Sequence, residues 1–161
     1  MVTAGAPYYA PLAEIDFEEA RRALAAHPLL MVGVARYGAP KMNPGGSPIF
    51  MGGTGARRPA VGLALTAATT AALPALAANL ALEVAPVRVN LIAAGFVDTP
   101  LSASLLGGDL EARRDHLRAT LPTGRVTSPD DVATLAIAIM SNTALTGATY
   151  DIDGGQQLLP K

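Results

Sequence analysis

The sequence predicts an α/β fold in which a parallel sheet of about four strands is covered by helices on both faces. Short apolar segments typical of buried strands alternate with longer segments of helical composition. The connections between these apolar segments are long enough to hold helices, as parallel strands require. Strands are expected at Met1–Ala4, Ser47–Met51, Val87–Ile92 and Ala148–Ile152. Each β-α-β unit is expected to make a right-handed crossover, and 161 residues suit a single domain, 1–161.

Start and stop signals define the helices between these strands. Asp16 followed by Glu19 has the form of a capping box, and Pro28 and Pro74 predict kinks or breaks. Asp130 and Asp131 follow Ser128-Pro129, so we interpret this acidic pair as helix capping rather than as a metal site or an acid/base pair. Thr99–Gly108 is expected to be a loop. The expected helices are Phe17–Pro40, Val61–Glu83, Asp109–Thr120 and Ser128–Asn142.

Composition excludes several classes of function. The 12 basic and 13 acidic side chains give a net charge of −1, which shows no electrostatic footprint for nucleic acid. The chain has no cysteine, and His27 and His116 lie too far apart in sequence for a local metal motif. No uninterrupted apolar stretch has the ~18 residues that a membrane span needs, and no signal core follows the N-terminus. We therefore expect a soluble, cytoplasmic domain without metal, membrane or nucleic acid as a partner.

Four segments, in chain order, resemble motifs of the short-chain dehydrogenase/reductase family. The segment VNLIAAGFVDTP is similar to that family's VNxIxPGxxxT, GRVTSPDDVA to GRxxxPEDVA, TGATYDIDGG to TGxxxxVDGG, and VTAG to NNAG; they span Val89–Pro100, Gly124–Ala133, Thr146–Gly155 and Val2–Gly5. The resemblance implies the C-terminal portion of a doubly wound, Rossmann-like domain. It also implies an oxidoreductase that uses NAD or NADP.

The resemblance assigns cofactor-facing roles to a small set of residues at strand ends, namely Ala4, Gly5, Gly95, Val97 and Thr99. No G-x-G-x-x-G turn occurs in the chain. The segment Gly52–Gly55 (GGTG) fits neither that fingerprint nor a P-loop, and a turn or close-packing role is favoured. Family members begin with a nucleotide-binding β-α-β unit that is not found here. The cofactor expectation is therefore NAD or NADP, or none.

The family's catalytic positions hold different residues in this chain. Alignment through the helix that follows Gly62 places Thr66 where the family has its Tyr acid, Thr70 where it has Lys, and Gly53 where it has Ser. His27 falls at the position of the family's Asn. An aliphatic hydroxyl is far less acidic than a phenol, whose pKa is about 10, and Thr70 carries no charge to tune it. The expected result is a degenerate catalytic site.

Three further features have alternative interpretations. His27 is either a replacement acid or relay group or, as we favour, a structural imidazole beside Pro28. Tyr37 and Lys41 form a literal Y-x-x-x-K, but Gly38 and Pro40 interrupt the helical turn, so a solvent-facing helix end is favoured. Arg57 and Arg58 are interpreted as exposed arginines at a helix entry rather than as a phosphate clamp.

Three functional hypotheses follow. The first is a short-chain dehydrogenase/reductase-like protein with little or no hydride transfer. The second is a non-catalytic module that forms homo-oligomers through the two long helices, because Val61–Glu83 is rich in alanine. The third is a fragment of a longer NAD(P)-binding reductase. The loop Leu101–Gly108 and the helix Asp109–Thr120 correspond to the family's substrate lid, but they do not identify a small-molecule substrate.

Overall fold

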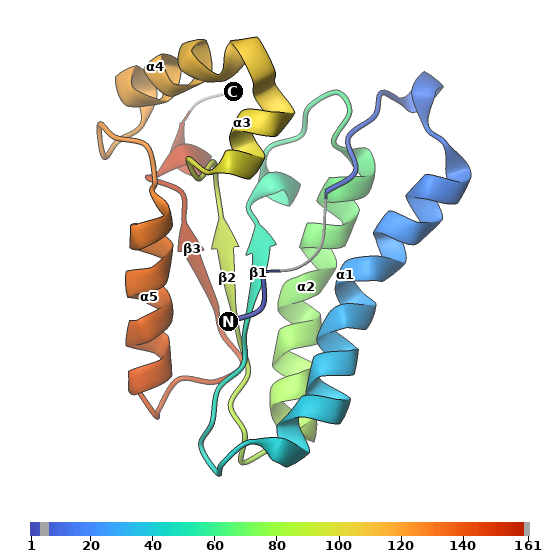
Figure 1. Ribbon diagram of the computed structural model, residues 1–161, viewed down its shortest axis with the longest axis vertical. Coiled ribbons are helices and arrows are strands. Elements are labelled where there is room, and N and C mark those ends of the chain that lie inside the picture. The colour runs from blue at the N-terminus through green and yellow to red at the C-terminus, as the bar shows by residue number, and fades with distance from the viewer. Residues whose placement is uncertain (4–6, 160–161) are drawn as a thin grey trace.

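A parallel sheet of three strands forms the centre of the molecule. The computed structural model describes residues 1–3 and 7–159 (Figure 1). The strands are β1 (Ile49–Gly53), β2 (Asn90–Ala94) and β3 (Thr149–Ile152), and their order across the sheet is β1-β2-β3. Both neighbouring pairs are parallel. The α/β class with a parallel sheet is thus confirmed.

The strand expected at Met1–Ala4 is wrong for the residues that the structure describes. Val2 makes an isolated parallel bridge with Phe50, and its N–H donates to the carbonyl of Ile49 at 2.8 Å. Ala4 and Gly5 lie outside the described residues. The described sheet therefore has three strands rather than about four, because a single bridged residue does not make a ladder.

Five α-helices surround the sheet: α1 (Phe17–Gly38), α2 (Ala64–Glu83), α3 (Pro100–Leu106), α4 (Leu110–Thr120) and α5 (Pro129–Ser141). Asp16 caps α1 as expected, accepting hydrogen bonds from the N–H groups of Glu18 and Glu19. Pro28 lies inside α1 without ending it, so a break at that point is wrong. Met31 and Ala35, beyond the proline, are buried in the core. Their packing offsets the hydrogen bond that a proline removes from a helix.

Alternate strand residues face two separate hydrophobic clusters, one on each side of the sheet. Phe50 and Leu91 pack with α1 and α2, whereas Ile49 and Ile92 pack with α5. Figure 1 shows α1 and α2 on one side of the strands and α5 on the other. The sheet is therefore buried on both faces, as predicted.

The two crossover connections have opposite hands. The step from β1 to β2 passes through α2, and the step from β2 to β3 passes through α5 on the opposite face, although both steps run in the same direction across the sheet. The expectation that every crossover is right-handed is therefore wrong. The β2–β3 connection contains three helices, so it is not the simple strand–helix–strand unit whose twist sets the usual hand.

The segment Thr99–Gly108 is largely helical, so its expected loop conformation is wrong. Thr99 is the N-cap of α3, and its hydroxyl accepts a hydrogen bond from the N–H of Ser102 at 3.1 Å. Pro100 occupies the first helical position, where its missing N–H costs nothing. The Thr-Pro pair is a helix start signal, but the Ser and Gly content of the segment masked it. Helices α3 and α4 lie over the carboxyl ends of the strands (Figure 1).

Helix α2 is apolar almost all round and only partly buried. By length and composition alone it could cross a membrane, but a core helix of a soluble protein passes the same test. Leu73 and Ala77 pack against the sheet. Only 22% of its most apolar stretch is buried, so one apolar face of α2 is open to solvent.

Candidate functional site

Four residues of this chain align with the family's catalytic positions. Three of them, Gly53, Thr66 and Thr70, lie at or near the carboxyl end of β1, and His27 contacts the same strand. Gly53 is the last residue of β1, and a Cβ atom built on it lies 3.5 Å from the Cγ2 of Thr70. Thr66 lies one turn before Thr70 on α2. The ring of His27 reaches from α1 to β1, with its Nε2 2.9 Å from the carbonyl oxygen of Met51. The space at Gly53 would admit a Cβ atom, so packing at this atom does not require glycine.

The hydroxyl groups of Thr66 and Thr70 both donate to backbone carbonyls. Thr66 Oγ1 donates to the carbonyl of Tyr8 at 2.6 Å. Thr70 Oγ1 lies 2.9 Å from the carbonyl of Thr66 and 3.1 Å from that of Ala67. A hydroxyl has one proton to donate. Neither threonine therefore directs its proton toward a substrate.

His27 is held by the strand that it contacts. A carbonyl oxygen can only accept, so the 2.9 Å contact places a hydrogen on Nε2. In a neutral ring, Nδ1 is then an acceptor. The Nε2 hydrogen of His27 is thus used in a hydrogen bond to the backbone of β1, which favours the structural interpretation of His27.

Three of the five predicted cofactor-facing residues, Gly95, Val97 and Thr99, are described by the structure, and each has a contact near the carboxyl end of β2. A Cβ atom on Gly95 would lie 2.6 Å from the Cβ of Asp153, closer than side chains approach one another. Val97 forms an isolated bridge with Thr127, and the Thr99 hydroxyl caps α3. The contacts of Gly95 and Thr99 explain these two residue types without a ligand.

Arg57 and Arg58 connect the segment after β1 to the segment after β3. Arg57 is exposed, as expected, whereas Arg58 is half-buried. Arg57 forms an ion pair with Asp151 and donates to Gln157 Oε1 at 2.5 Å. Arg58 is half-buried and donates to the carbonyl of Gln156. The hydrogen bond from Arg57 holds the pKa of Asp151 below its usual value. The sequence offered no signal for these contacts, because the partners lie almost one hundred residues apart.

An ion pair connects α4 to the loop that follows β2. Arg114 Nη2 lies 2.6 Å from the Oδ1 of Asp98, and the same guanidinium also pairs with Glu111. The N–H of Asp98 donates to the carbonyl of Thr127 at 2.9 Å. This pair fixes the segment that corresponds to the family's lid against the carboxyl edge of the sheet.

The structural interpretations favoured for Tyr37 with Lys41 and for Asp131 are confirmed. Tyr37 is 66% exposed with the Arg36 guanidinium 5.4 Å from its ring centre, and Lys41 is exposed beyond the end of α1. Asp131 completes a capping box with Ser128. Among residues 1–3 and 7–159, no group of three or more His, Asp or Glu side chains is arranged to hold a metal.

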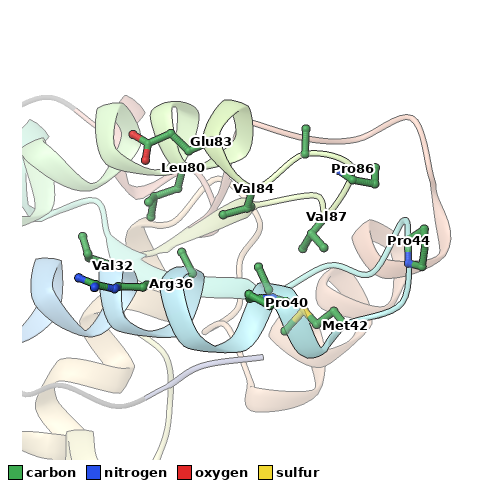
Figure 2. Close-up of a pocket in the computed structure, with 13 residues that line it drawn as sticks. Val32, Arg36, Pro40, Met42, Pro44, Leu80, Glu83, Val84, Pro86 and Val87 are labelled. Atoms are coloured by element: carbon green, nitrogen blue, oxygen red, sulfur yellow. The ribbon is translucent and has the colours of Figure 1, made fainter.

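Two cavities in the described part of the molecule are lined by other residues. One, of about 700 Å³, opens between the C-terminal ends of α1 and α2 (Figure 2). Its apolar walls include Val32, Met42 and Val84, with Arg36 and Glu83 on opposite helices. A second, of about 400 Å³, lies beside the start of α2 and is lined by Ala10, Leu12, Pro59, Leu63 and Ala67. Neither includes His27, Gly53, Thr66 or Thr70 in its lining.

Comparison with known proteins identifies the family. Residues 2–157 match the family described as Enoyl-(Acyl carrier protein) reductase. The chain belongs to the short-chain dehydrogenase/reductase family. It is 30% identical over 159 residues to the short-chain dehydrogenase/reductase malC of Malbranchea aurantiaca. The aligned region covers 92% of this chain and 57% of malC. It is 38% identical over 106 residues to the 4-formylbenzenesulfonate dehydrogenase of Comamonas testosteroni, covering 63% of this chain and 42% of that protein.

Solved structures give the same assignment. A small-chain dehydrogenase in complex with NADPH superposes with a TM-score of 0.89 at 29% identity, over 97% of this chain and 72% of that chain. The MalC reductase/Diels-Alderase of Malbranchea aurantiaca superposes with a TM-score of 0.83 at 30% identity, over 98% of this chain and 61% of that chain. The chain thus spans about half the length of the two curated relatives. Its fold is a part of the short-chain dehydrogenase/reductase fold.

Proposed function

We propose that this short-chain dehydrogenase/reductase has little or no hydride-transfer activity of the Tyr–Lys type. The observation that carries the proposal is the hydrogen bonding of two hydroxyl groups. Thr66 and Thr70, at the aligned positions of the family's acid and its tuning cation, donate their hydroxyl hydrogens to backbone carbonyls. Loss of a general acid typically lowers a rate by ~10²–10⁴. Here the aligned Ser position, Gly53, also lacks a side chain.

The residues present fit a nicotinamide cofactor poorly. The 161 residues contain no glycine-rich G-x-G-x-x-G turn, which in dinucleotide sites brings backbone N–H groups to the pyrophosphate. The Thr99 hydroxyl is used as the cap of α3, and Gly95 is packed against Asp153. One solved relative holds NADPH. Weak or no binding of NAD(P)H is the proposal for this chain.

Two measurements test the proposal. NADPH or NADH oxidation is followed by its absorbance with a panel of aldehydes and ketones, and we expect no saturable turnover. Saturable turnover that disappears in His27→Gln would overturn the proposal and assign the proton to the imidazole. Thermal unfolding with each nucleotide measures binding separately from chemistry. A nucleotide present at 100 times its Kd would stabilise the fold by ~2.7 kcal/mol, which raises Tm by about 5–10 °C. Because we propose weak or no binding, we expect each nucleotide to raise Tm by less than this.

A second candidate function is self-association through the long helices. Helix α2 exposes small apolar side chains along one face, and Leu82 at its end is 81% exposed. The exposed alanines are Ala64, Ala68, Ala71, Ala72 and Ala75. Small side chains allow helices to approach closely, and an apolar face of this kind favours burial against a second protein surface.

Light scattering tests self-association directly. We expect a dimer or larger assembly at micromolar concentration, and a monomer when Ala72→Arg places a charge in the exposed face of α2. Ala119→Arg, at an exposed position of α4 and so outside this face, is the matched control for the added charge. A wild-type chain that stays monomeric over the whole concentration range contradicts this candidate.

A further inference from the structure

The cavity of about 700 Å³ between the C-terminal ends of α1 and α2 has the size and the apolar base of a small-molecule site. Cavities that bind small molecules typically enclose about 300–1,000 Å³. The residues at its base are apolar and buried, and they come from the ends of both helices and from the segment before β2: Ala35, Ala39, Leu80 and Val87. An apolar group placed against them would be removed from water, which favours binding.

Two oppositely charged side chains lie at one end of this cavity. Of the residues that line it, only Arg36 on α1 and Glu83 on α2 carry a charge. Figure 2 shows both side chains toward the same end of the cavity. The other end is formed by apolar residues, among them Met42, Pro44 and Pro86 (Figure 2). The cavity therefore has a charged end and an apolar end.

Glu83 lacks a compensating positive charge. It is the last residue of α2, where the helix dipole leaves partial negative charge, and the last turn of α2 contains no basic residue. Among residues 1–3 and 7–159, the Glu83 carboxylate takes part in no ion pair. A cation at this point would be stabilised both by the carboxylate and by the last carbonyls of α2, which have no partner within the helix. The end of α2 thus favours a positively charged ligand group.

The opposite wall offers the complementary charge. Arg36 lies in the last turn of α1, and its guanidinium carbon is 5.4 Å from the ring centre of Tyr37. This contact involves a face of the guanidinium, whereas the N–H groups lie at its edge. In the described part of the chain, Arg36 forms no ion pair, with Glu83 or with another carboxylate. A ligand carboxylate could therefore accept two parallel hydrogen bonds from Arg36.

We propose that this cavity binds a free amino acid with a large apolar side chain. Its ammonium group contacts Glu83, its carboxylate contacts Arg36, and its side chain extends toward the apolar end. Both charged groups of an amino acid are attached to one carbon atom, which suits a cavity whose two charges lie at the same end. The site does not depend on hydride transfer. None of the exposed alanines of α2 that support self-association lines the cavity, so the two proposals can fail separately.

Titration with L-phenylalanine, followed by NMR of isotope-labelled methionine methyl groups, tests the site. Met42 lines the cavity, whereas Met140 lies on α5, on the other side of the sheet. The Met42 signal, assigned with Met42→Leu, should shift in a saturable way, and the Met140 signal should stay in place. A Kd of about 0.1–3 mM is expected for a ligand of this size.

Two analogues separate the two charges of the ligand. Phenylpropionate lacks the ammonium group and phenethylamine lacks the carboxylate, so each should bind more weakly than phenylalanine. Arg36→Gln should weaken the binding of phenylalanine and phenylpropionate by about 3–10-fold and should not weaken that of phenethylamine. Glu83→Gln should weaken phenylalanine and phenethylamine to the same extent and should not weaken phenylpropionate. Arg21→Gln is the matched control, since Arg21 is exposed on α1, pairs with Glu18 and does not line the cavity.

The outcome does not depend on a change in stability. Arg36 and Glu83 are both exposed, so both variants should melt at the temperature of the wild-type chain. Glycine, which has the two charges but no apolar side chain, should bind more weakly than phenylalanine. The proposal is overturned if phenylalanine gives no saturable shift of Met42 up to about 50 mM. It is also overturned if glycine or either analogue binds as tightly as phenylalanine, or if either Arg36→Gln or Glu83→Gln binds phenylalanine as the wild-type chain does.

Discussion

Replacing Arg88 with Met should destabilise the fold strongly, because the Arg88 guanidinium holds the end of α5 against the sheet. Arg88 precedes β2 and is only 6% exposed. Its nitrogen atoms donate to five backbone carbonyls at 2.8–3.1 Å, those of Gly45, Ile139, Met140, Asn142 and Leu145. Two of these carbonyls belong to the last turn of α5, whose carbonyls have no partner within the helix.

The size of the effect follows from these contacts. Nη1 has two hydrogens for three carbonyls, so about four of the five contacts can be well-formed at one time. Removal of a buried charged donor from such a network costs about 3–5 kcal/mol. For a domain of this length each kcal/mol corresponds to about 2–4 °C. We therefore expect Arg88→Met to lower Tm by about 6–20 °C.

Thermal and urea unfolding followed by circular dichroism measure this loss. Arg88→Lys keeps the charge but reaches fewer carbonyls, so its Tm should lie between those of Arg88→Met and wild type. Arg118→Met is the control, because Arg118 forms an exposed ion pair worth at most about 1 kcal/mol. If Arg88→Met melted within about 2 °C of wild type, the assignment of Arg88 as the cap of α5 would be refuted.

Two further predictions concern the strand ends and the capping box. Gly95→Ala should lower the free energy of unfolding by about 1–3 kcal/mol, since its Cβ would lie 2.6 Å from that of Asp153; Gly53→Ala, whose Cβ has no neighbour closer than 3.5 Å, is the control in the same urea titration. Hydrogen bonds from Arg125 and Ser128 hold the pKa of Asp131 well below its usual value, so its contribution to stability is present at neutral pH and is lost as pH falls below about 4. The stability difference between wild type and Asp131→Asn should therefore shrink between pH 5 and 2, and a difference that stays constant would contradict it.

The fold was accessible to prediction where the pattern is local. The Asp16 and Ser128 caps act within a few residues, and both appear at their predicted places. Three of the four predicted strands are present, with bounds that differ from the predicted ones by at most three residues. The errors arose where another part of the chain decided the outcome. Pro28 does not break α1, because the residues beyond it are buried against the core. The hand of the β2–β3 crossover depends on a connection that contains three helices.

The candidate site divides in the same way. The sequence by itself determined that the aligned catalytic positions hold Gly53, Thr66 and Thr70, and hence that no phenol or amine is present there. Only the tertiary structure decided which partners the hydroxyl and guanidinium groups near these positions contact. Thr66 donates to a carbonyl 58 residues away, and Arg57 pairs with a carboxylate 94 residues away. Local patterns fix an element because neighbouring residues share its backbone geometry, whereas a side chain's partner depends on the path that distant segments take across the sheet.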